Sequence, residues 1–116
     1  MWPDKASDRA TLVDLITACS RIVSFAERAT LEQLERDPQL MSALAFQIAI
    51  LGEATKRLTL EIRQSNPEVQ WKAIAGMRDR LIHGYDEIDL QELWQTVTHD
   101  VPTLLEQLER IQTNEV

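Results

Sequence analysis

The sequence contains little cysteine, glycine or proline. Of its 116 residues, one is cysteine, three are glycine and four are proline. A single cysteine excludes an internal disulfide framework and a cysteine-based zinc site. So few glycines and prolines argue against a collagen-like, low-complexity or turn-rich β architecture. The 44% of hydrophobic and 27% of charged residues are typical of one globular domain, which we expect to span residues 1–116.

Several signals for particular functions are also missing. The N-terminus has no basic region followed by an apolar stretch, so we expect no signal peptide. The longest uncharged stretch, residues 38–52, is too short to cross a bilayer. Neither familiar glycine-rich nucleotide-binding motif occurs, and the two histidines lack a metal-binding spacing. We therefore expect a cytoplasmic protein with no membrane contact, no metal and no other cofactor.

The net charge is acidic, but the basic residues are unevenly distributed. Twelve lysines and arginines against nineteen acidic residues give −7, which excludes a general nucleic-acid-coating protein, because such proteins are basic. Residues 52–85 contain six basic and four acidic residues, a net +2, so the remainder carries −9. This balance is compatible with an enzyme that has one local basic groove.

Apolar residues recur at three- and four-residue spacing along nearly the whole chain, which predicts helices. We expect them at residues 8–26, after a capping Thr30, from Asp37-Pro38 to at least residue 58, from 71 to about 83–84, and from about 89 onward. Thr59 is expected to break or re-cap the third helix, and Pro102 to kink the last. The predicted fold class is all-α, an antiparallel bundle of four or five helices.

The helix that begins at Pro38 is apolar on more than one side and contains several small residues. Ala43, Ala45, Ala49 and Gly52 would let another backbone approach closely. Two interpretations remain open: a buried central helix, or a helix that faces both its own core and a second copy of the chain.

Residues 76–85 hold one of the two histidines, the only tyrosine and two of the nine arginines. Histidine can transfer a proton near neutral pH, and arginine binds phosphate oxygens in a bidentate manner. Asp79 and His83 are four residues apart, so on one helix the aspartate would orient the imidazole and raise its pKa. Arg78 is five residues before His83, so the two need a frayed helix end or a second chain to meet over one substrate. A purely structural role for these residues also remains open.

Two other reactive side chains are expected to be structural. Cys19 lies on the apolar stripe of the first predicted helix, which is typical of a buried thiol rather than a nucleophile. His99 is adjacent to Asp100 in the last predicted helix and is expected to be a solvated surface residue.

The residues from Arg78 to Tyr85 match the pattern R-x4-H-x-Y, and this segment resembles the HEPN-domain ribonucleases. More narrowly, the chain is similar to the HepT-like toxins of toxin–antitoxin pairs. The similarity includes Leu51-Gly52-Glu53-Ala54, Trp71, Gly76-Met77-Arg78-Asp79, residues 90–94 and Val101-Pro102. It extends over nearly the whole chain and is weakest before residue 8 and after residue 110.

The resemblance implies a HEPN-like helical homodimer with the two R-x4-H motifs meeting in a cleft at the interface. It also implies a metal-independent endoribonuclease in which the 2′-hydroxyl attacks the adjacent phosphorus, leaving a 2′,3′-cyclic phosphate and a 5′-hydroxyl. In this sequence, His83 would be the general acid or base, Arg78 the phosphate clamp and Asp79 a supporting group.

The resemblance further implies that the chain is the toxin of a type VII-like toxin–antitoxin pair. A nucleotidyltransferase antitoxin would neutralise it by adding AMP to Tyr85, and higher assembly of the homodimer with that antitoxin is left open. For the RNA substrate, the positive segment offers groove candidates at Arg80, Lys72, Lys56 and Arg57. The alternative is a non-catalytic HEPN dimer that binds a nucleotidyltransferase, a nucleotide or RNA.

Overall fold

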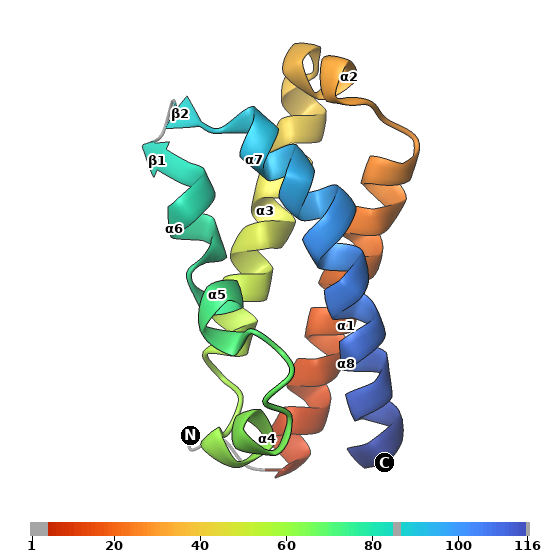
Figure 1. The fold of residues 1–116 in the computed structure, drawn as a ribbon, viewed down its shortest axis with the longest axis vertical. Coiled ribbons are helices and arrows are strands. Elements are labelled where there is room, and N and C mark those ends of the chain that lie inside the picture. The colour runs from red at the N-terminus through yellow and green to blue at the C-terminus, as the bar shows by residue number, and fades with distance from the viewer. Residues whose placement is uncertain (1–4, 85–86, 116) are drawn as a thin grey trace.

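Three long helices form the centre of the fold (Figure 1). The computed structural model describes residues 5–84 and 87–115. Helix α1 (Lys5–Glu27) packs against both α3 (Pro38–Thr55) and α8 (Val101–Glu115). Helices α5 (Trp71–Ala75) and α6 (Met77–Leu81) pack along α3. This arrangement confirms the predicted all-α bundle.

The shorter elements lie mainly at the two ends of the bundle. They are α2 (Leu31–Arg36), α4 (Leu60–Ser65), the strands β1 (Ile82–Gly84) and β2 (Glu87–Ile88), α7 (Leu90–Gln95) and the π-helical segment η1 (Thr96–Asp100). Helix α2 and the strands lie at one end, and α4 lies at the other (Figure 1). The strands pair antiparallel, with Ile82 opposite Ile88 and Gly84 opposite Glu87.

The predicted helix starts are confirmed at three positions. The Thr30 hydroxyl accepts a hydrogen bond from the Gln33 amide at 3.1 Å, and the Gln33 side chain accepts one from the Thr30 amide at 2.9 Å. Asp37 accepts two backbone hydrogen bonds at the start of α3, immediately before Pro38. Thr59 caps α4. Each cap satisfies backbone donors that have no partner within the helix.

The third helix was predicted to reach residue 58, and this was wrong, because α3 ends at Thr55. The cause is a contact with α1. Asp8, which is only 4% exposed, accepts a hydrogen bond from the Thr59 amide at 3.0 Å and another from the Thr59 hydroxyl at 2.6 Å. These bonds hold the Thr59 backbone in an extended conformation, which a continuing helix could not adopt.

The prediction of one helix from residue 71 to about 84 was also wrong. Gly76 separates α5 from α6, and α6 ends at Leu81. Ile82 is already extended, with φ −114° and ψ 107°. The Leu81 carbonyl accepts a hydrogen bond from the Asp89 amide at 3.1 Å, and β1 pairs with β2. His83 therefore lies in a strand, because pairing with a later segment replaces the last helical turn.

Pro102 lies in the second position of α8, directly after η1. The chain changes direction between α7 and α8 (Figure 1). The π-helical segment η1 lies within this change of direction and directly precedes α8.

The hydrophobic core consists of side chains on the inner faces of the long helices and of α6. It includes Leu12, Leu15 and Ile22 of α1, Leu44, Ile48 and Leu51 of α3, Leu81 of α6, and Leu104 and Leu108 of α8. Burying each of these side chains stabilises the fold by about 1.5–3 kcal/mol before entropic costs are counted. Among the described helices, none has the length and apolar character needed to cross a membrane.

Gly52 marks a close approach between α3 and α5. A Cβ atom at this position would lie 3.3 Å from the Ala75 carbonyl oxygen and 3.6 Å from that of Ile74. At Gly52, therefore, the space left by a small residue is used by a helix of the same chain, as the central-helix interpretation requires.

We expect Gly52→Ala to destabilise the protein by about 1 kcal/mol, because a crowded backbone contact outweighs the better helix propensity of alanine. Urea denaturation would measure this change. The matched control is Gly76→Ala, where the new Cβ would lie 3.6 Å from the Lys72 carbonyl oxygen, an ordinary contact. Equal stability of the two variants would show that the α3–α5 contact adapts without cost.

Candidate functional site

The residues of the R-x4-H-x-Y motif lie around the junction between α6 and β1. Arg78 and Asp79 are exposed on α6, and His83 is exposed on β1. Between them, Leu81 is 1% exposed and anchors the end of α6 in the core. Tyr85 lies outside the described residues. The junction thus presents a guanidinium and an imidazole to solvent from two adjoining elements.

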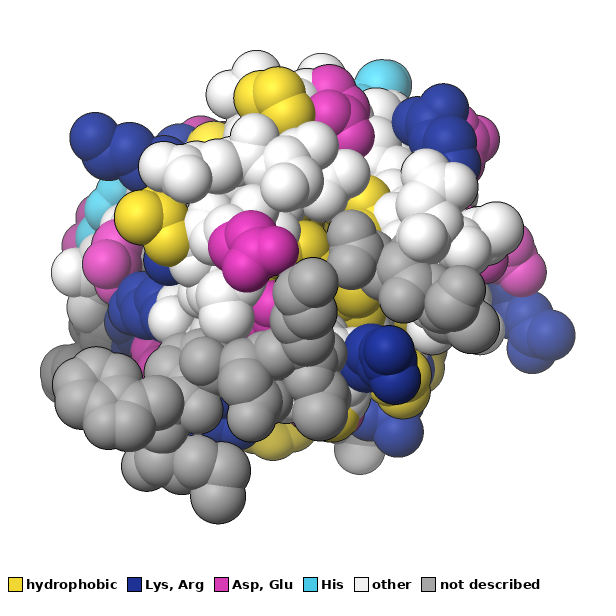
Figure 2. Space-filling model, turned by 90° about the horizontal axis from the view of Figure 1, so that it is seen from below, with side chains coloured by type: hydrophobic (Ala, Val, Ile, Leu, Met, Phe, Trp, Pro, Cys, Tyr) yellow, Lys and Arg dark blue, Asp and Glu magenta, His cyan; other side chains and the backbone are white. Residues whose placement is uncertain are grey.

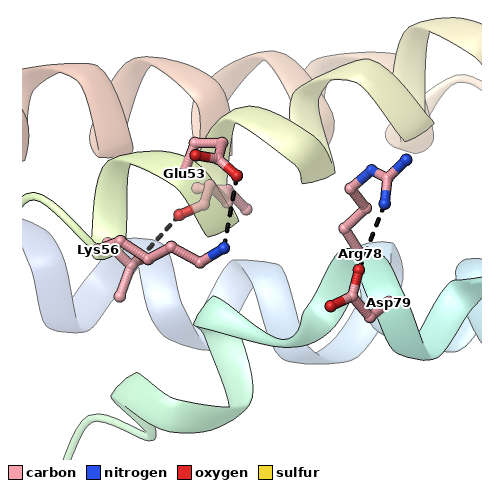
Figure 3. A network of polar contacts seen from close by, with 6 residues as sticks. Glu53, Lys56, Arg78 and Asp79 are labelled. Atoms are coloured by element: carbon pink, nitrogen blue, oxygen red, sulfur yellow. Dashed lines mark hydrogen bonds and ion pairs between the residues drawn. The ribbon is translucent and has the colours of Figure 1, made fainter.

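Asp79 is paired with Arg78 rather than aligned with His83 (Figure 3). An Nη atom of Arg78 donates to Oδ1 of Asp79 at 3.3 Å. The expected four-residue helical relation between Asp79 and His83 is wrong, because α6 ends before His83. No hydrogen-bond partner of the His83 ring is found within residues 5–84 and 87–115. Asp79 therefore pairs with the Arg78 guanidinium. The other N–H groups of this guanidinium can still donate hydrogen bonds to a second anion.

A second charged pair lies at the C-terminal end of α3. Lys56 Nζ lies 3.4 Å from a carboxylate oxygen of Glu53. Figure 3 shows this pair near the C-terminal end of α3, and Arg78 with Asp79 as a separate pair on α6, which packs against α3. The groove candidate Lys56 thus lies directly after α3, the helix against which the Arg78-bearing α6 packs. Sequence reasoning did not select Glu53 as a site residue, although its three-residue spacing from Lys56 was a usable signal.

The other residues predicted to line an RNA groove, Arg80, Arg57 and Lys72, lie on separate parts of the surface. Arg80 Nε donates to Glu92 of α7 at 3.0 Å and lines a groove of about 470 Å³ between α5–α6 and η1–α8. Arg57 lines a different groove, between α1 and α3. Lys72 is exposed on α5. Acidic and basic side chains are interspersed over the visible part of the α4 end of the bundle (Figure 2).

Cys19 and His99 have the structural positions predicted for them. Cys19 is fully buried, and burial, with a smaller effect of the Glu109 charge, raises the pKa of its thiol to about 12. The thiol is therefore protonated at neutral pH and is not a nucleophile. His99 is exposed on η1, with its Nδ1 2.9 Å from the Thr98 hydroxyl. In the described part of the chain, no group of three or more His, Cys, Asp or Glu residues is arranged to hold a metal ion.

Comparison with known proteins assigns the family. The family model "Ribonuclease HepT-like" matches residues 15–111. The chain is 34% identical to "Putative RNase TTE0752" of Caldanaerobacter subterraneus subsp. tengcongensis, over 89% of this chain and 92% of that protein. It is 33% identical to "Probable ribonuclease HepT" of Thermococcus cleftensis, over 92% of this chain and 97% of that protein.

One further relative matches this chain over only about a third of its own length. The chain is 40% identical to "Gamma-glutamylcyclotransferase and putative RNase MJ0434" of Methanocaldococcus jannaschii, over 62% of this chain and 32% of that protein. No solved structure matches the chain. With nearly all of its helical core matched by the family model, this chain belongs to the HepT-like ribonuclease family.

Proposed function

We propose that the chain is a metal-independent endoribonuclease and the toxin of a type VII-like toxin–antitoxin pair. The observation that supports this most directly is the exposure of Arg78 and His83 on adjoining elements in a chain of a ribonuclease family. In the proposal, two copies of the chain form the cleft, so that groups from both can face one phosphate. In the same proposal, Lys56 contributes to binding the RNA backbone.

The proposed reaction is an internal transesterification. The 2′-oxygen of the RNA forms a bond to phosphorus, the bond from phosphorus to the 5′-oxygen breaks, and a 2′,3′-cyclic phosphate and a 5′-hydroxyl result. His83 takes the proton from the 2′-hydroxyl or gives one to the leaving 5′-oxygen. Arg78 binds the non-bridging oxygens, where negative charge grows in the transition state. Asp79, which accepts a hydrogen bond from one Nη atom of Arg78, helps to orient that side chain.

The test is cleavage of several RNA types by purified protein in EDTA, with mass spectrometry first confirming an unmodified Tyr85. The expected products carry 2′,3′-cyclic phosphate and 5′-hydroxyl ends. Cleavage that appears only when a divalent metal is restored would contradict the metal-independent mechanism. No cleavage of any RNA would favour the alternative, a dimer that binds its partner, a nucleotide or RNA without cutting.

Tyr85 is the proposed point of neutralisation. The nucleotidyltransferase partner would transfer the α-phosphoryl group of ATP, with its adenosine, to the tyrosine hydroxyl, releasing pyrophosphate. The AMP group adds bulk and negative charge near the cleft and repels the RNA backbone.

We expect the partner and ATP to silence wild-type protein as it gains one AMP, and to leave Tyr85→Phe both unmodified and active. Intact-mass spectrometry and the RNA cleavage assay would be run on the same samples. Because Tyr85 is the only tyrosine, no second tyrosine can complicate the result. Silencing of Tyr85→Phe by the partner and ATP would rule out this mechanism.

A further inference from the structure

The strand that carries His83 belongs to a very small sheet. Strands β1 and β2 are three and two residues long and, within the described chain, pair only with each other. A two-stranded hairpin of this kind is marginally stable in water by itself. Because the His83 ring has no hydrogen-bond partner among the described residues, the backbone of β1 decides where that ring lies. The contacts that hold the β1–β2 hairpin in place therefore also hold His83.

An ion pair joins the two helices that flank this hairpin. The chain leaves α6, passes through the two strands and returns in α7, which packs against α6 (Figure 1). Arg80 Nε on α6 donates to Oε1 of Glu92 on α7 at 3.0 Å, although the two residues are twelve positions apart in the chain. The pair thus connects the element before the hairpin with the element after it.

Hydrogen bonds continue from this ion pair to the base of the hairpin. The Glu92 amide donates to Oδ1 of Asp89 at 3.0 Å. The Asp89 amide donates in turn to the carbonyl of Leu81 at 3.1 Å, and Leu81 directly precedes β1. Ile82 and Ile88, which are opposite each other in the two strands, both pack against the hydrophobic core. A fixed distance between α6 and α7 therefore fixes the base of the hairpin.

This ion pair differs from an ordinary surface pair elsewhere in the chain. The side chains of Arg80 and Glu92 are 41% and 39% exposed. Those of Arg36 and Glu32, also joined at 3.0 Å but within α2, are 78% and 70% exposed. Water competes less with a partly buried pair. In addition, a pair within one helix cannot set the distance between two elements, whereas the α6–α7 pair can.

Arg80 points away from the side of α6 that carries Arg78. A helix turns by about 100° per residue, so residues two positions apart do not face the same way. We propose that Arg80 and Glu92 are positioning residues for His83. Their ion pair fixes the hairpin relative to α6, and so the imidazole of His83 relative to the Arg78 guanidinium. This role rests on the proposed function, in which the imidazole and the guanidinium act on RNA.

Single-turnover cleavage at saturating RNA, measured together with the RNA dissociation constant, tests this role. Arg80→Ala and Glu92→Ala are each expected to slow cleavage about tenfold and to leave the dissociation constant within about twofold, because a misplaced proton-transfer group lowers the rate rather than the affinity. The double variant should be no slower than either single variant, since the second substitution removes a group that has already lost its partner. Glu92→Gln keeps an oxygen that can accept from Arg80 and should stay within about threefold of the wild-type rate.

Glu32→Ala is the matched control. It also removes a first-turn glutamate that is paired with an arginine, but on α2, and it should cleave RNA at the wild-type rate. Circular dichroism would confirm that every variant is folded at the assay temperature. Wild-type cleavage by both Arg80→Ala and Glu92→Ala would overturn the positioning role.

The same measurements distinguish positioning from a direct contact between Arg80 and RNA. If Arg80 binds the RNA backbone, Arg80→Ala weakens binding and reduces its salt dependence. Glu92→Ala would then tighten binding, because it frees the arginine and removes a negative charge. That pair of results, with an unchanged cleavage step, would overturn the positioning role and assign Arg80 to the RNA backbone.

Hydrogen exchange of the Asp89 amide measures the ion pair without RNA. This amide donates to the Leu81 carbonyl at the base of the hairpin. Its protection is expected to fall about tenfold in Arg80→Ala and in Glu92→Ala, and to stay unchanged in Glu32→Ala, since exchange reports local opening. Unchanged protection in both pair variants would overturn the inference even if the protein is a ribonuclease. Reduced protection in a protein that cleaves no RNA would confirm that the pair holds the hairpin and would refute the proposed function instead.

Discussion

Replacing His83 with alanine is expected to lower the rate of RNA cleavage about 100- to 10,000-fold. This is the usual contribution of a positioned group that transfers a proton in the transition state. His83 is exposed on β1, so its ring contributes little to the core. The variant should therefore keep the wild-type melting temperature while losing activity, which single-turnover cleavage and a thermal melt would measure together.

His99 provides a matched control for this variant. It is the only other histidine, it is also exposed, and it lies on η1 rather than at the α6–β1 junction. His99→Ala is expected to cleave RNA at the wild-type rate. If His83→Ala retained full activity, a general acid–base role for His83 would be excluded, whatever the reaction of the protein.

Replacing Leu81 with alanine is expected to cost about 2–5 kcal/mol of unfolding free energy. The side chain is 1% exposed at the end of α6, and its removal leaves a cavity as well as losing buried apolar surface. For a domain of this size, such a loss lowers the melting temperature by about 10 °C or more. Calorimetry or denaturant unfolding would measure it.

Leu60 supplies the control for the leucine substitution. It is 62% exposed on α4, and Leu60→Ala is expected to change stability by no more than about 0.5 kcal/mol. If both leucine variants were equally stable, Leu81 would not be the anchor that holds the junction. Below its melting transition, Leu81→Ala should also cleave RNA more slowly, because Leu81 is the last residue of α6, which carries Arg78, and directly precedes β1, which carries His83.

The helix starts could be predicted because local chemistry decides them. The caps at Thr30, Asp37 and Thr59 are made by side chains that bond to backbone groups two or three residues later. The bonds at Thr30 and Asp37 depend only on neighbouring residues, whereas the Thr59 hydroxyl also donates to Asp8 of α1. The burial of Cys19 was predictable for a related reason, since a residue on an apolar helical stripe faces the core.

The sequence predicted which residues form the candidate site, but not how these residues are arranged in space. The spacing of Arg78, His83 and Tyr85 is visible in the sequence, and it indicated the family. The proposed pairing of Asp79 with His83 assumed a helix through both residues. Strand pairing between Ile82 and Ile88 and the bond from Asp89 to Leu81 replace that helical turn, and the sequence around the motif contains no signal of this choice.

The sequence alone therefore determined the all-α class, the capped starts of α2 and α3 and the family motif, because periodicity, capping and spacing are short-range properties. Only the tertiary structure decided where α3 ends, which helix occupies the space beside Gly52, and which partner Asp79 has. The partner of Asp79 follows from the hairpin of β1 and β2, which ends α6 before His83. The other two depend on residues far apart in the chain: Asp8 with Thr59, and Gly52 with Ala75. Contacts between distant residues form when the helices pack, so no short-range sequence pattern predicts them.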